Sequence, residues 1–214
     1  MSKIDKSSTV FVVDDDPAVR TSLARALIMR GYMVETFGSA RDFLDDYETH
    51  FSGGCLILDY GMPGMSGLEL QDHLNRNGHN LPTIFITGHG GIPESVQAMK
   101  GGALDFLEKP FKQSDLMERV RAALDVAALN RTNAQAQIEL QGRFERLTPR
   151  ESEIVDHILA NPGEISSKEI GRHLDISPRT VDHHRARILE KLNVASVVEL
   201  IDLARRADYY GRAG

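Results

Sequence analysis

The sequence predicts an α/β domain built on a doubly wound, five-stranded parallel sheet, joined by a helical linker to an all-α domain of four helices. Up to about residue 125, short β-rich runs alternate with stretches of helical periodicity. From Thr148 onward the periodicity is helical only. Several β-rich runs are almost continuously apolar, which is typical of parallel strands covered on both faces.

The β-rich runs and the stretches between them predict the order of the elements. Strands are predicted at 9–13, 33–37, 55–59, 83–87 and 105–109. Helices are predicted at 17–30, 39–47, 67–77 and 92–100. Pro17 suits the first turn of a helix and Gly31 suits its end. The connections between the parallel strands are expected to be right-handed.

Residues 113–146 follow the last strand and contain neither Gly nor Pro before Gly142. The Asn, Gln and Ala content of 130–142 marks a junction between domains. The predicted division is 1–125 for the first domain, 126–146 for a helical linker and 147–214 for the second domain. A frayed linker is the alternative.

The C-terminal domain carries clear helix boundaries. Thr148 followed by Glu151 is a capping box, with Pro149 at the first helical position. Farther along, a helix is predicted to break at 175–177, and a second helix is predicted to begin at Pro178 behind a capping serine. The apolar positions expected to face inward are Ile170, Leu174, Val181, Ile188, Leu189 and Leu192.

Charge is distributed unevenly along the chain. The formal net charge is −6 at pH 7. Residues 1–128 hold 12 Lys and Arg against 18 Asp and Glu, whereas residues 129–214 hold 13 of each. This balance is a weak electrostatic footprint for nucleic acid, so charge alone does not identify a DNA-binding domain.

Composition predicts a cytoplasmic protein with no membrane contact. No apolar run approaches the ~20 residues that a membrane helix needs. The first ten residues lack the apolar region of a secretory signal. The single cysteine, Cys55, cannot form an internal disulfide and lies in an apolar run, so we expect a core side chain rather than a reactive thiol.

Polar residues stand where the predicted strands end. Asp14 and Asp15 follow the first strand, and the third, fourth and fifth strands end at Asp59, Thr87 and Lys109. The carboxyl ends of parallel strands meet at one edge of the sheet, where ligands bind. Three carboxylates in one crevice would repel one another, and a bound cation removes that repulsion. Ligands that are all oxygens favour Mg²⁺, with Mn²⁺ as a substitute.

These groups suit phosphoryl transfer. Asp59 would act as the nucleophile and form an aspartyl-phosphate. Mg²⁺ and Lys109 would neutralise charge on the phosphoryl group, and the Thr87 hydroxyl would donate to one of its oxygens. Each residue also has a structural alternative, such as helix capping for 14–16 or a solvated side chain for Lys109. Their joint occurrence at successive strand ends favours the site.

The segments FVVDDDPAVR, LILDYGMPGMSGLEL, IFITGHG and DFLEKPF resemble the flavodoxin-like receiver domain of two-component response regulators, over residues 9 to about 125. The resemblance implies that Asp59 is the phosphoacceptor and that Asp15, beside Asp14, is a direct Mg²⁺ ligand. The other residues it implies are the Gly61 backbone carbonyl as a metal ligand, Lys109 as the phosphate partner, and Thr87, Phe106 and Pro110 as switch residues, with a cis Lys109–Pro110 bond. Gly61 departs from the side-chain-bearing residue more usual there, so the lifetime of the phosphoryl group is not predicted.

The segments LTPRE, SSKEIGRHLDISPRTVDHHRARILEKL and SVVELIDLARR resemble the LuxR-type helix-turn-helix, so the whole chain resembles the FixJ branch of the NarL/FixJ response regulators. The resemblance implies that 178–192 is the recognition helix, which docks in the major groove. Candidate phosphate contacts are Lys168, Arg179, Thr180, His184, Arg187 and Lys191. Asp182, His183 and Ala186 are expected to approach base edges. For His184 a buried structural role is equally open, and the long stretch ANPGEISS leaves the placement of Lys168 open.

The sequence therefore predicts a transcriptional response regulator rather than an enzyme, with at most slow autodephosphorylation. The expected partners are a sensor histidine kinase, double-stranded DNA with a two-fold promoter site, RNA polymerase and a second copy of the chain. Because one helix-turn-helix offers few contacts to DNA, two copies joined on phosphorylation should bind DNA more tightly than one. By resemblance to the FixJ branch, activation of transcription is the expected output. The family resemblance implies that the receiver surface around the fourth helix and fifth strand is the interface, and residues 196–207 are expected to add contacts. Two alternatives stay open: a Mg²⁺-dependent phosphohydrolase, whose usual second Asp is Gly61 here, and a receiver whose output is protein–protein contact.

Overall fold

The structure, a computed structural model, describes residues 9–50, 53–88 and 92–209. The chain divides into two compact units, Met1–Thr132 and Asn133–Gly214. Each unit has a hydrophobic core of its own.

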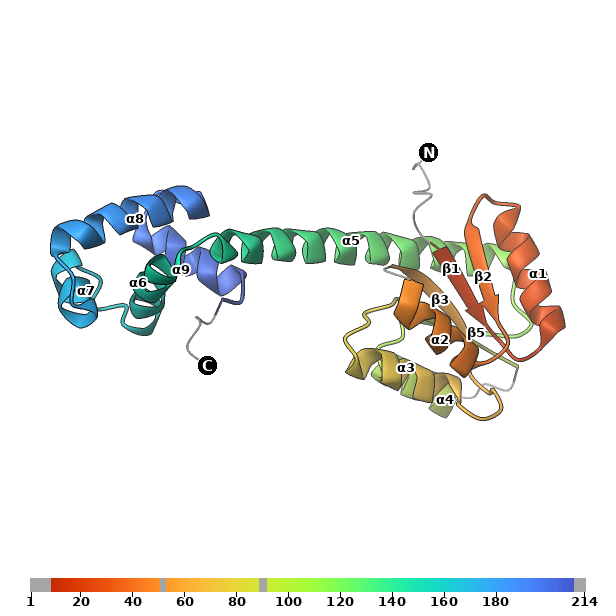
Figure 1. Cartoon of the computed structure of the whole chain (residues 1–214). Helices are drawn as coiled ribbons and strands as arrows, with labels where there is room; N and C mark the ends of the chain where they lie inside the picture. Colours follow the sequence, from red (N-terminus) through yellow and green to blue (C-terminus); the bar gives the residue numbers. More distant parts are fainter. Residues whose placement is uncertain (1–8, 51–52, 89–91, 210–214) are drawn as a thin grey trace. The chain divides into compact units, whose positions relative to one another are not determined.

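The N-terminal unit is a parallel sheet with helices on both faces (Figure 1). Its strands lie in the order β2-β1-β3-β4-β5, which confirms the doubly wound sheet. The strands are β1 (Thr9–Val13), β2 (Met33–Phe37), β3 (Gly54–Asp59), β4 (Thr83–Thr87) and β5 (Asp105–Glu108). The helices are α1 (Pro17–Ile28), α2 (Ala40–His50), α3 (Gly67–Arg76), α4 (Ile92–Lys100) and the start of α5 (Gln113–Glu145).

Alternation along the strands builds a core on each face of the sheet. Phe11 and Val13 of β1 join the core formed with α2, α3 and α4. Val10 and Val12 of the same strand join the core formed with α1 and the first turns of α5. All five residues of β1 are buried, because a central parallel strand is covered on both sides. Burial of both faces fixes the register, which in turn fixes where each strand ends.

The C-terminal unit consists of α6 (Pro149–Ala160), α7 (Ser167–Leu174), α8 (Pro178–Leu192) and α9 (Val197–Arg206), packed with the end of α5. The predicted capping box at Thr148 and Glu151 is present. The predicted break between helices is confirmed: α7 ends at a left-handed Asp175, and Ser177 caps α8. The predicted inward positions are buried or packed against the core.

The segment that joins the sheet-based domain to the helical domain is itself helical, because α5 continues without a break to Glu145. Phe144 and Leu147, at its end, belong to the C-terminal core. The domain limits inferred from the sequence, at 125/126 and 146/147, stay predictions. Among the described residues, no helix is long and apolar enough to cross a bilayer.

Gly67 at the start of α3 has no room for a side chain. A Cβ at this position would lie 2.3 Å from the Asp59 carbonyl oxygen and 2.9 Å from the Phe85 ring. Because a backbone atom of β3 cannot move aside, we expect Gly67→Ala to destabilise the N-terminal unit by about 2 kcal/mol. Hydrogen exchange in peptides from β3 and α3 of the full chain measures this loss.

Gly142 provides a matched control for Gly67, because a Cβ there meets no atom within 4 Å. It lies inside α5, where alanine is favoured over glycine by about 1 kcal/mol. We therefore expect Gly142→Ala to be neutral or stabilising. Equal behaviour of the two variants would contradict the steric argument.

Candidate functional site

Three of the predicted polar side chains meet at the carboxyl edge of the sheet. Lys109, just after β5, donates from Nζ to Asp14 Oδ2 at 2.8 Å and to Asp59 Oδ1 at 2.7 Å. Asp14 is 1 % exposed and Asp59 7 % exposed. One ammonium therefore joins two buried carboxylates that are far apart in the sequence.

Backbone hydrogen bonds hold the two acids in place. The Asp14 N–H donates to the Phe37 carbonyl of β2, and Arg20 of α1 donates to the Asp14 carbonyl. Asp59 is in register with Ile86 of β4, and its Oδ2 accepts from the Gly61 N–H at 2.9 Å. The position of Asp59 is thus set by the sheet on one side and by its own turn on the other.

The two carboxylates at this edge of the sheet change the pKa of Lys109. Burial alone would lower the pKa of Lys109, but the hydrogen bonds that it donates to Asp14 and Asp59 and the negative charges of these two acids outweigh burial, so the pKa of Lys109 is raised. Lys109 is therefore held in its cationic form. A fixed positive charge beside Asp59 is suited to anionic ligands such as phosphoryl oxygens.

The remaining predicted residues of this edge are placed differently from one another. Thr87 is buried at the end of β4, and Phe106 of β5 packs half-buried against the core that contains Phe85. Asp15 and Gly61 are exposed. The Lys109–Pro110 bond is cis, as the resemblance implies.

Two of the three predicted carboxylates, Asp14 and Asp59, lie together at Lys109, and the metal site stays a prediction. Within the described ranges, no three His, Cys, Asp or Glu side chains stand together as metal ligands. Lys109 lies between Asp14 and Asp59 and offsets one of their two negative charges. The donor chemistry still fits Mg²⁺, because the groups at this edge offer carboxylate and carbonyl oxygens, which are hard ligands.

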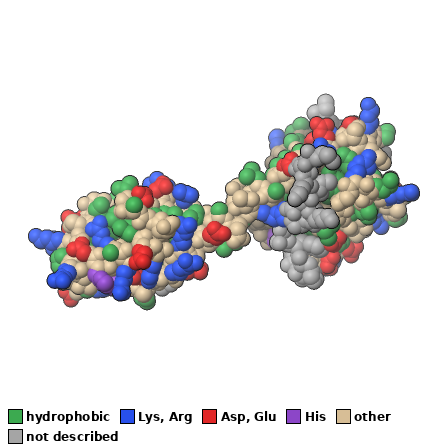
Figure 2. All heavy atoms as spheres, turned by 90° about the horizontal axis from the view of Figure 1, so that it is seen from above, with side chains coloured by type: hydrophobic (Ala, Val, Ile, Leu, Met, Phe, Trp, Pro, Cys, Tyr) green, Lys and Arg blue, Asp and Glu red, His purple; other side chains and the backbone are tan. Residues whose placement is uncertain are grey.

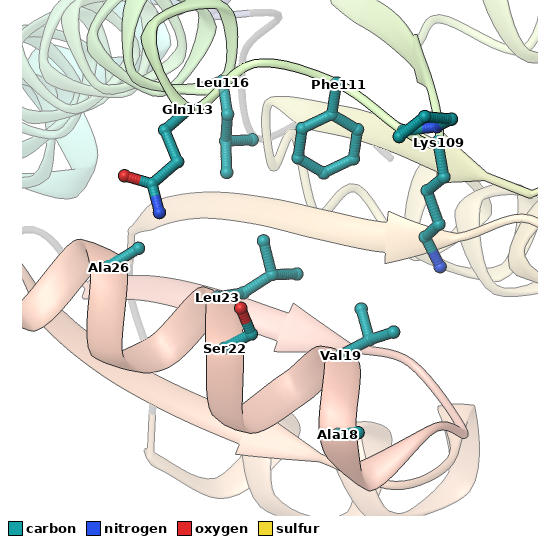
Figure 3. A pocket seen from close by; sticks show the side chains of 10 residues that line it. Ala18, Val19, Ser22, Leu23, Ala26, Lys109, Phe111, Gln113 and Leu116 are labelled. Atoms are coloured by element: carbon teal, nitrogen blue, oxygen red, sulfur yellow. The ribbon is translucent and has the colours of Figure 1, made fainter.

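A cleft of about 470 Å³ opens beside Lys109, between α1 and the start of α5 (Figure 3). Figure 3 shows Leu23 of α1 facing Phe111 and Leu116, with Lys109 at one end. Ser22 and Gln113 add polar groups to this mainly apolar lining. The cleft could not be predicted from the sequence, because its two walls are about 90 residues apart in the chain.

In the C-terminal unit, α8 presents an exposed face next to its buried one. Val181, Ile188 and Leu192 are buried. The exposed candidates for DNA contact are Lys168, Arg179, Thr180, Asp182, His183, Ala186 and Arg187. His184 is half-buried, and its Nδ1 is enclosed without a hydrogen-bond partner among the described residues.

Two of the predicted DNA contacts are engaged within the protein. Lys191 Nζ donates to the buried Glu151 at 2.6 Å and to the Arg146 carbonyl at 3.1 Å. The Asp182 carboxylate accepts from the Ser167 hydroxyl of α7. Lys191 is thus paired within the protein although its side chain is 33 % exposed, and its role as a phosphate contact stays a prediction.

The surface of the C-terminal unit mixes both signs of charge. Figure 2 shows Lys and Arg interspersed with Asp and Glu over the unit on the left, rather than one continuous basic field. This pattern agrees with the weak footprint read from the sequence.

Comparison with known proteins identifies both units. Residues 10–121 match the response regulator receiver domain, and residues 145–204 match the luxR family of bacterial regulatory proteins. The chain belongs to the response regulators. Its relatives include the response regulator TodT of Pseudomonas putida, 41 % identical over 94 % of this chain and 87 % of TodT. FixJ of Azorhizobium caulinodans is 41 % identical over 93 % of this chain and 92 % of FixJ.

Solved structures of response regulators resemble this one along most of its length. The response regulator StyR matches with a TM-score of 0.75 and 40 % identity, covering 94 % of this chain and 99 % of StyR. Full-length FixJ from B. japonicum matches with a TM-score of 0.57 and 36 % identity, covering 95 % and 98 %. These relatives are regulators, which favours a regulator with a DNA-binding domain over the phosphohydrolase alternative.

Most of the residues that support these sites in this response regulator carry no recognisable signal in the sequence. Arg20 holds the Asp14 backbone, and Arg150 of α6 donates to the Leu174 carbonyl at the end of α7. Glu151 anchors Lys191 as well as capping α6. A signal was present only for Glu151, through its capping box; the arginines stand at positions that look solvated in the sequence.

Proposed function

We propose that a sensor histidine kinase phosphorylates Asp59 and that phosphorylation promotes dimerisation and binding to a two-fold promoter site. Transcription activation, with RNA polymerase as a further partner, is the proposed output. Such partners would place the protein in the cytoplasm. The arrangement that carries this proposal is the Lys109 ammonium held between Asp14 and Asp59, in a chain that also has a luxR-family domain.

The proposed transfer is a displacement at phosphorus. An Asp59 carboxylate oxygen forms the new P–O bond while the bond from phosphorus to the donor imidazole nitrogen breaks. Lys109 stays hydrogen-bonded at this edge and offsets the added negative charge. Thr87 would then donate its hydroxyl to a phosphoryl oxygen, and the half-buried Phe106 would repack.

Mg²⁺, or Mn²⁺ as a substitute, fits the oxygen donors at this edge. The residues that would hold it are Asp14, Asp15, Asp59 and the Gly61 carbonyl. When bound, the ion would supply positive charge that stabilises the phosphoryl oxygens. The buried Asp14 also accepts from the Asp16 N–H at 2.9 Å, which keeps its carboxylate oriented.

Dimerisation is proposed through α4 and β5. Val96 and Met99 of α4 are 43 % and 48 % exposed, although they are apolar. Val198 of α9, 74 % exposed, is a second apolar position that would add contacts between two helix-turn-helix domains. Burial of such side chains between two copies would offset the weak binding of a single domain.

A selection experiment tests this proposal. The full chain is phosphorylated with a small-molecule phosphoryl donor and Mg²⁺, and it is then mixed with randomised double-stranded DNA. We expect a two-fold site to be selected and bound at least about tenfold more tightly than by unphosphorylated protein, with doubled mass in solution. Chelation of the metal before phosphorylation should abolish both effects. Equal DNA affinity and equal mass in the two states would contradict the proposal.

A further inference from the structure

Asp182 and Arg185 of α8 converge on one residue of α7. The Ser167 hydroxyl donates to Asp182 Oδ1. Arg185 Nη1 lies 3.3 Å from the same hydroxyl oxygen and 3.1 Å from the Ile165 carbonyl. Four polar groups from two helices and the loop before α7 are thus joined by hydrogen bonds, and we name this set the α7–α8 clamp: Ile165, Ser167, Asp182 and Arg185.

The position of Ser167 favours an anion as its acceptor. Ser167 is the first residue of α7, directly after the Ser166 cap. Backbone N–H groups at a helix start carry partial positive charge, which stabilises a neighbouring carboxylate. Asp182 is therefore oriented by α7 even though it is exposed.

An exposed face of α8 begins beside the clamp. Residues three and four apart share a helix face, which groups Asp182 with Arg179 and Ala186, and these two with His183. All four are exposed. Asp182 and Arg185 lie together at one edge of this face, toward α7, where their side chains meet Ser167.

We propose that Asp182 is a positioning residue that fixes α8 against α7, and that base reading falls mainly to His183. This inference rests on the proposed DNA binding and differs from the base-contacting role that the resemblance implies for Asp182. An imidazole can donate to or accept from a base edge. The small Ala186 next to it lets the helix backbone approach the groove. The Asp182 carboxylate is already hydrogen-bonded to Ser167, so its role is to position α8 and not to contact a base.

The base preference at each position of the DNA site distinguishes a residue that positions α8 from a residue that contacts bases. We expect Asp182→Ala and Ser167→Ala to weaken binding of the phosphorylated chain to its selected DNA about three- to tenfold each, with the same preferred sequence. The double variant should be no weaker than either single variant, because both remove the same hydrogen bond. Asp182→Asn, which keeps an acceptor for Ser167, should restore most of the affinity.

His183→Ala is the contrasting variant. It should relax the preference at one or two base pairs of each half-site, while affinity for non-specific DNA changes little. A changed base preference in Asp182→Ala that is absent from Ser167→Ala would overturn the proposal. So would an unchanged preference in His183→Ala. Failure of the unsubstituted, phosphorylated chain to select any DNA would instead reject the proposed function, so the two failures are distinguishable.

Discussion

Replacement of Asp59 by Asn is expected to abolish phosphoryl transfer while leaving the fold intact. The amide has no anionic oxygen to attack phosphorus, so transfer should stop rather than slow. Folding should survive because Lys109 keeps its hydrogen bond to Asp14 at 2.8 Å. The measurement is incorporation of radiolabelled phosphoryl group from a histidine kinase or a small-molecule donor. The phosphorylation-dependent gain in DNA affinity should disappear with it.

Asp72→Asn is the matched control for Asp59→Asn. Asp72 is an exposed acid of α3 paired with Arg76 at 2.6 Å. An exposed pair of this kind contributes little, at most about 0.5 kcal/mol. Labelling of this variant should equal that of the unsubstituted chain. Hydroxylamine-sensitive label that persists in Asp59→Asn would contradict the assignment of the acceptor.

The sheet and its edge could be predicted because their signals are local and additive. Apolar runs mark the strands, and a parallel sheet brings all carboxyl ends together whatever the loops do. Asp59 ends β3 and Thr87 ends β4, as the runs predict. The sequence could not show that Lys109 would stand between Asp14 and Asp59, because pairing geometry depends on side chains from three strands.

Contacts between neighbouring helices were harder to predict from the sequence than the strands of the sheet. Periodicity places Lys191 and Asp182 on the outer side of α8, and both positions look solvated in the sequence. Their partners are 40 and 15 residues away, on α6 and α7. Helical period tells which residues share a face, but it does not tell which neighbouring helix meets the edge of that face. The same limit hid Arg150, whose acceptor is the Leu174 carbonyl.

Removal of the Lys191 charge is expected to destabilise the C-terminal unit. The Glu151 side chain is 2 % exposed, and Lys191 Nζ lies 2.6 Å from it. Lys191→Met leaves that carboxylate without its cation, which costs several kcal/mol in a fully buried pair. Because the Lys191 side chain is 33 % exposed, water offsets part of the loss, and we expect about 2 kcal/mol. Hydrogen exchange of α6 and α8 in the full chain gives the free energy of opening.

The pH dependence of this loss identifies its electrostatic origin. Burial would raise the pKa of Glu151, but hydrogen bonds from Lys191 and Thr148 and the Lys191 charge outweigh it and lower the pKa. A lowered folded-state pKa gives stability that is present above the unfolded value of about 4.3 and is lost as pH falls below it. The difference between Lys191→Met and the unsubstituted chain should therefore be full at pH 7 and shrink below about pH 4. The double variant Lys191→Met with Glu151→Gln should recover much of the stability. The Gln side chain keeps an acceptor for the Thr148 N–H but carries no buried charge. A loss that stays constant with pH and is not relieved by Glu151→Gln would show that Lys191 acts through packing of its aliphatic chain instead.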